Sequence, residues 1–184
     1  MENLPGFTSD QLDDAQARYG LRFPPDLLDL LQARRLDERY DWAGECPAIR
    51  AMLEWPFDMM RFDVEQGFWW PDWGERPDSE EARVEVLRAA LAEAPRLIPL
   101  YTHRFLPEEP CEAGNPVFSM HGFDTVLYGA NLSAYVKNEF GWDWGLPAQV
   151  ARPIRFWSDL VDRFDAAYAF YEEAVINKRP GGAA

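Results

Sequence analysis

The stretch LIPLYTHRFLPEEPCEAGNPVFSMHGFDTVLYGANLSAYVKNEF, residues 97–140, decides the fold of this chain. It begins with a short apolar run, Leu97–Tyr101, which is typical of a β-strand. Two further strand-like runs follow, Pro116–Met120 and Thr125–Tyr128, and the turn-prone segment His121–Asp124 separates them. The stretch therefore predicts a sheet in which the last two strands form a hairpin.

A helix is predicted directly after these strands. Asn131 is placed to cap its N-terminus, and Gly141 stands at the C′ position, where glycine readily adopts a left-handed backbone. In the strand before it, Val126 and Tyr128 share one face, as expected of a half-buried strand. The helix has one apolar stripe, made of Leu132, Tyr135, Val136 and Phe140. Because such a unit buries a sheet face under a helix, we place the centre of the domain here.

Two more helices are predicted near the N-terminus. Thr8 and Gln11 have the spacing of a capping box, which marks the start of the first helix. Gly20 ends that helix. The second helix begins at Pro24 and Pro25, residues favoured in a first turn, and is rich in leucine. Together they predict a helical hairpin packed against the sheet.

The run GFTSDQLDDAQARYGLRFPPDLLDLLQ, residues 6–32, resembles the opening of the SUKH superfamily. That group unites fungal cell-wall-synthesis regulators with many bacterial immunity proteins. The shared pattern is a capped helix, a Gly-terminated turn, an L-P-x-D step and a Leu-rich helix. Residues that match it in order are Gly20, Leu21, Phe23, Pro24, Pro25, Asp26 and Leu30. Residues 97–140 are similar to the family's second half, whereas residues 34–37 lack the Asn-Gly common at that point.

This resemblance implies one SUKH-like domain, which we place over residues 1–177. The terminal segment after it, residues 178–184, is predicted to be a disordered tail. The resemblance also implies an immunity-type inhibitor, which neutralises a toxin, often a basic nuclease, by occluding its active cleft. The family's core does not need the large Trp-rich block that this chain carries at residues 55–78.

The Trp-rich block is WPFDMMRFDVEQGFWWPDWGERPD. Within it Phe62 and Val64 alternate with Asp63 and Glu65, which predicts a strand edged with acid. The tryptophans that follow are Trp69, Trp70 and Trp73. These rings either cover the sheet beneath a long loop or form a platform for a ligand or partner, because Trp often serves as an interface anchor.

Two further helices complete the predicted fold. Asp78 is placed to cap the first of them, which ends before Pro95. The second runs from about Trp157 to Asn177. Its apolar stripe comprises Leu160, Phe164, Ala167, Tyr171 and Val175.

The chain has 184 residues, a length typical of one domain, and a formal net charge of -14. This charge argues against nucleic acid as a partner and favours a basic protein. No apolar run approaches the length of a membrane span, and the N-terminus lacks a signal-peptide core. The two cysteines, Cys46 and Cys111, form no disulfide framework. We therefore expect a cytoplasmic protein with reduced thiols and no membrane contact.

The sequence carries no catalytic or metal-binding pattern. The candidate metal ligands lack a known spacing; they are His103, Cys111, Glu112 and His121. Nothing obvious orients an imidazole for a Cys–His pair, and the sequence has neither a phosphate loop nor a Gly-flanked nucleophilic serine. Asp63 and Glu65 could act as acid and base, although such carboxylates more often form a solvated face. We therefore predict no enzymatic activity, no cofactor and no metal.

His103 and Arg104 lie where the first strand runs out into a loop. One interpretation is structural, with Arg104 paired to one of the many carboxylates. The other is a polar binding spot beside Asn115 and Tyr128. The sequence leaves both open.

These observations predict an α+β fold, with a mostly antiparallel sheet, an N-terminal helical hairpin, a Trp-rich insertion and a long C-terminal helix. The function that they favour is non-enzymatic binding of a basic protein. The predicted partner contacts are Asp63, Glu65, Trp69, Trp70, Asp72, Trp73, Glu75, His103 and Arg104. The alternatives are a regulatory scaffold with a non-toxin partner, and a small-molecule or glycan binder that uses the Trp rings.

Overall fold

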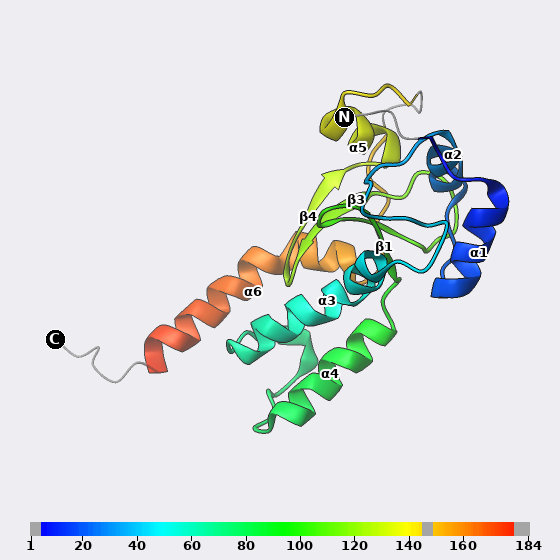
Figure 1. Ribbon diagram of the computed structural model, residues 1–184. Helices are drawn as coiled ribbons and strands as arrows, with labels where there is room; N and C mark the ends of the chain where they lie inside the picture. Colours follow the sequence, from blue (N-terminus) through cyan, green and yellow to red (C-terminus); the bar gives the residue numbers. More distant parts are fainter. Residues whose placement is uncertain (1–4, 145–148, 179–184) are drawn as a thin grey trace.

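The computed structural model describes residues 5–144 and 149–178, which form an α+β fold (Figure 1). In chain order the elements are α1 (Ser9–Tyr19), α2 (Pro25–Ala33), α3 (Pro47–Glu65), η1 (Pro71–Trp73), α4 (Glu80–Ala92), β1 (Leu97–Tyr101), β2 (Arg104–Pro107), β3 (Val117–His121), β4 (Asp124–Gly129), α5 (Leu132–Phe140) and α6 (Trp157–Lys178). Lys178, assigned above to the tail, ends α6; the rest of the predicted tail, residues 179–184, and the side chain of Val175 lie outside the described residues.

The sheet is a meander in the order β1-β2-β3-β4, in which each strand pairs antiparallel with the next. This confirms the predicted antiparallel sheet. The sequence reading missed β2, which pairs with β1 directly across a tight turn, Tyr101 opposite Arg104. Thr102 takes a positive φ of 47° in this turn. A turn built on Thr and His lacks the Asn-Gly or Asp-Gly pair that announces a short hairpin.

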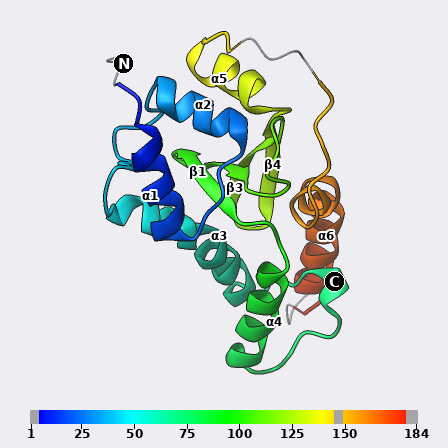
Figure 2. The same ribbon diagram turned by 90° about the vertical axis from the view of Figure 1, so that its right-hand side faces the viewer.

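Neighbouring side chains of a strand enter hydrophobic clusters on opposite faces of the sheet. Ile98 and Leu106 pack with α1, α2 and α5, whereas Leu97 and Phe105 pack with the C-terminal half of α3, with α4 and with α6. In both views α2 and α5 lie at the opposite end of the molecule from α4 (Figures 1 and 2). Helices therefore cover both faces, which explains why β1 is buried along most of its length.

The N-terminal helical hairpin is confirmed. The Thr8 hydroxyl accepts from the Gln11 N–H at 3.2 Å, and the Gln11 side chain accepts from the Thr8 N–H at 2.9 Å. Gly20 ends α1 with a φ of 63°, a left-handed conformation in which a β-carbon is strained. Pro25 then stands in the first turn of α2, as predicted.

Helix α3 shows that the prediction of a strand at residues 62–65 was wrong. Pro47 stands in the first turn of this helix, and Phe62 is 53% exposed. The buried side chains of the helix recur at helical spacing: Ile49, Pro56, Met60 and Val64. An alternation over four positions was too short to outweigh this longer stripe.

The later helices match the predictions with small corrections. The hydroxyl of Ser79, rather than the carboxylate of Asp78, caps α4. The Asn131 side chain caps α5, and Gly141 ends it with a φ of 72°. Strand β4 is more open than a half-buried strand, because Val126 is 47% exposed. Helix α6 runs past the sheet and extends away from it (Figure 1).

Candidate binding site at the β3–β4 hairpin

The turn between β3 and β4 is fixed against the last turns of α3. Gly122 has a φ of 70°, and a β-carbon there would collide with Oδ2 of Asp63. The next residue, Phe123, donates its backbone N–H to that same oxygen at 2.9 Å and is only 1% exposed. The hairpin therefore holds the carboxylate of Asp63 in one position.

A pocket of about 460 Å³ opens between this hairpin, the end of α3 and the middle of α6. We call it the hairpin pocket. Its polar lining comes from Asp63, Gln66, His121 and Asp124, and its aromatic lining from Phe68, Phe123, Phe164, Tyr168 and Tyr171. The volume lies within the range of pockets that hold small organic groups.

The aromatic walls of the hairpin pocket support one another. The Phe68 ring centroid lies 4.6 Å from that of Phe123 and 5.7 Å from that of Tyr171. The Tyr171 hydroxyl donates to the Gln66 carbonyl at 3.0 Å, which ties α6 to the end of α3. Tyr168 packs against Tyr171 and is 41% exposed. The pocket thus has a rigid aromatic floor and one exposed ring at its rim.

The electrostatics of the pocket are set by its carboxylates. Burial raises the pKa of Asp63 above its usual value, the Phe123 N–H and His121 act in the opposite direction, and Asp124 adds to the rise. In the part of the chain that the structure describes, no ion pair reaches Asp63 or Asp124. The two acids therefore face the pocket without an ion-pair partner among the described residues, and His121 is the basic side chain of the lining.

The other predicted acidic contacts lie outside the pocket lining. Glu65 pairs with Arg61 at 2.6 Å, one helical turn away. Asp72 is held by the guanidinium of Arg163 through bonds of 2.5 and 2.8 Å. Glu75 is exposed. Of the predicted acidic contacts, Asp63 is the one that lines the hairpin pocket.

The predicted Trp contacts are largely covered. Trp70 is 5% exposed and stacks on Phe123 with ring centroids 6.0 Å apart. Trp69 donates its indole N–H to the Gly74 carbonyl at 2.9 Å and meets Trp73 edge to face. The geometry therefore matches the first of the two interpretations, in which the rings cover the core beneath the loop.

The predicted His103 and Arg104 contacts belong to a separate cluster. The Arg104 guanidinium lies 3.8 Å above the Tyr128 ring, donates to Ser119 at 2.9 Å and stands 3.6 Å from Glu139. It also contacts the ring of His103, whose pKa is lowered by burial, by Arg104 and by His121. The guanidinium of Arg104 thus interacts with groups of its own chain, which matches the structural interpretation.

Sequence reasoning missed most of the hairpin pocket. The pattern that could have indicated it is the spacing of Phe164, Tyr168 and Tyr171 on one side of the final helix. The joining of this stripe to Asp63 and the hairpin turn is a tertiary arrangement, and no local pattern encodes it.

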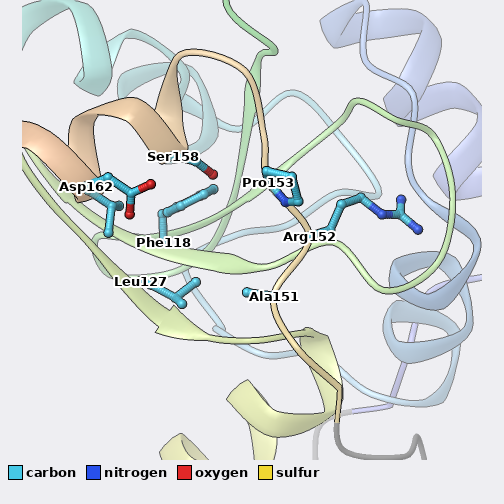
Figure 3. Close-up of a pocket in the computed structure, with 8 residues that line it drawn as sticks. Phe118, Leu127, Ala151, Arg152, Pro153, Ser158 and Asp162 are labelled. Atoms are coloured by element: carbon cyan, nitrogen blue, oxygen red, sulfur yellow. The ribbon is translucent and has the colours of Figure 1, made fainter.

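A second, smaller pocket of about 220 Å³ lies between β4 and the start of α6. Phe118 and Leu127 form its apolar side, and Ser158 and Asp162 approach from α6 (Figure 3). The Arg152 side chain points away from this pocket and donates to Asn115 at 3.0 Å. The pocket has no aromatic cluster comparable with that of the hairpin pocket.

Within residues 5–144 and 149–178, no three His, Cys, Asp or Glu side chains gather in a way that could hold a metal ion. None of the described helices is long and apolar enough to cross a membrane. Comparison of the chain with protein-family models, with curated proteins and with solved structures gives no match.

Proposed function

We propose that this chain is a non-enzymatic protein-binding module of the immunity type, which acts in the cytoplasm and neutralises a basic toxin domain by direct contact. The contact surface in this proposal is the hairpin pocket together with the adjoining part of α6. One observation carries this proposal. Two carboxylates, Asp63 and Asp124, line the same pocket as Tyr168, whose ring is 41% exposed at the pocket rim.

The charge and the exposed rings support a protein partner. The net charge of -14 attracts a basic surface over several ångströms. On α6, Tyr168 and Phe170 are 41% and 68% exposed, and large aromatic side chains are typical of interface centres. A basic protein would therefore be attracted by the charge and retained by the rings.

The immunity role is the finer part of the proposal. It rests on the resemblance of residues 6–32 to the opening of SUKH proteins, whose bacterial members include many immunity proteins. Occlusion of a toxin's catalytic cleft requires binding alone, so the chain needs no catalytic group for this role.

The test has two steps, recovery of the partner and a measurement of whether the chain neutralises its toxicity. The tagged chain is used to recover a partner from the source cell, and that partner is then expressed with and without the chain. We expect the partner alone to stop growth, and co-expression of the chain to restore it. A partner that binds without being toxic would contradict the immunity role and favour the regulatory scaffold instead.

A further inference from the structure

The hairpin pocket has the composition of a site for an organic cation. A ring face carries partial negative charge and attracts a guanidinium or ammonium group, and a nearby carboxylate adds a directed, charge-assisted hydrogen bond. The pocket offers both, because its aromatic lining stands beside Asp63 and Asp124.

No arginine or lysine of the described residues lines the pocket, and the basic side chain in its lining is that of His121. The arginines that stack on rings do so over rings outside the pocket lining. Two examples are Arg104, which lies over Tyr128, and Arg163, which lies over Trp70 while it pairs with Asp72. In the described ranges the pocket carboxylates therefore have no arginine or lysine partner, although carboxylates elsewhere, such as Glu65, do have arginine partners.

The pocket carboxylate is also costly to keep. Asp63 is half-buried, and burial raises its pKa because the charged form loses solvation. A neutral side chain at this position would avoid that cost to the stability of the folded state. The Phe123 N–H would keep an oxygen acceptor if the carboxylate were an amide, although its bond to the charged group is the stronger one. A charge whose burial the folded chain disfavours on balance, held at a fixed point beside aromatic rings, is suited to binding.

We propose that the hairpin pocket receives one arginine or lysine side chain of the protein partner, which lies over the pocket rings with its charge against Asp63 and Asp124. This proposal rests on the proposed function, and it adds the chemistry by which the partner is recognised. The occupant is a side chain of a protein because the net charge of -14 attracts a basic protein surface, and because Phe170, 68% exposed on α6 and outside the pocket lining, offers a contact that a free small cation would leave uncovered.

The experiment uses small probes and needs no partner. N-acetyl-arginine amide, N-acetyl-lysine amide and N-acetyl-citrulline amide are titrated into the isotope-labelled full chain, and the backbone amide signals of Gly122 and Phe123 are followed by NMR. Citrulline has nearly the shape of arginine without its charge. We expect saturable shifts with arginine or lysine amide and none with citrulline amide.

Matched variants locate the effect. Asp63→Asn and Tyr168→Ala should each weaken probe binding by roughly tenfold, which corresponds to the loss of about 1.4 kcal/mol. Asp72→Asn removes the same charge outside the pocket lining and should leave probe binding unchanged. Equal binding of citrulline amide, or equal weakening by Asp72→Asn, would show that the pocket does not recognise a cation and would overturn the proposal.

A second measurement separates this proposal from the proposed function. Once a partner is recovered, its affinity is measured for the wild type, Asp63→Asn and Asp72→Asn. A selective loss in Asp63→Asn supports the proposal. Strong partner binding that Asp63→Asn leaves unchanged overturns the role of the pocket while the binding function stands. Failure to recover any partner, with cation binding intact, would instead leave a small-cation site and overturn the protein occupant.

Discussion

Gly20 is a residue whose backbone the fold requires to be left-handed. Its φ is 63° at the end of α1, and the chain turns there toward the buried Leu21. Gly20→Val should lower the free energy of unfolding by more than about 1 kcal/mol, because a β-branched side chain is strained in this conformation. Gly20→Asn is the matched control, since Asn tolerates the left-handed region. Thermal unfolding measures both, and equal stability of Gly20→Val and wild type would contradict this account.

The carboxylate of Asp63 should make the stability of the folded chain depend on pH in one direction. Its pKa is raised in the folded chain, mainly by burial, so the folded state binds more protons than the unfolded state between the usual and the raised value. Stability from this group is therefore lost as pH rises through that window. Asp63→Asn removes the loss, and its free energy of unfolding relative to wild type should rise between about pH 3 and about pH 7.

Asp72 provides the control of opposite sign. Its pKa is lowered by the bond from Arg163, so its contribution is present above the unfolded value and is lost as pH falls through the folded value. Asp72→Asn should therefore lose stability relative to wild type as pH rises over the same range. Urea unfolding at both pH values checks the pair, and a flat difference for Asp63→Asn would show that its carboxylate is not strained by burial.

At the scale of elements, α3 provides a test of helix against strand. The helix turns Met60 inward, where it is fully buried, and leaves Phe62 53% exposed. Met60→Ala should lower the free energy of unfolding by about 2–5 kcal/mol through the lost packing and the cavity left behind. Phe62→Ala should change it by less than about 1 kcal/mol. Urea denaturation of the two variants distinguishes helix from strand. A strand would bury Phe62 and Val64 on the same face, so Phe62→Ala would then be strongly destabilising.

The elements that the sequence predicted are those with a strong local signal. Thr8 with Gln11 and Asn131 with Gly141 bound their helices through contacts a few residues apart, and these patterns can be read directly. Strand β2 follows a turn without a recognisable hairpin signal, and the end of α3 depends on partners distant in the chain. So does the hairpin pocket, because Asp63 and Tyr168 lie 105 positions apart in the sequence. The α+β class was predictable for this reason, and the site was not.

At the scale of the whole molecule, charge and aromatic surface should control different rates of partner binding. The net charge of -14 acts at a distance and is screened by salt, so neutralising exposed carboxylates outside the pocket lining, such as Glu75, should mainly slow association. Tyr168 and Phe170 act only in contact, so their replacement by Ala should mainly speed dissociation, with a loss of about 2 kcal/mol where a ring is a hot spot.

The measurement is surface-based kinetics of the recovered partner at low and high salt, with wild type, a carboxylate-neutralised variant and Tyr168→Ala. Raising the salt should reduce the association rate of the wild type more than that of the neutralised variant, because fewer charges remain to be screened. Tyr168→Ala should keep the salt dependence of the wild type, since its charge is unchanged. If Tyr168→Ala and Phe170→Ala both leave the dissociation rate unaltered, the partner does not contact this part of α6. The acidic field would then steer a partner to another face of the molecule.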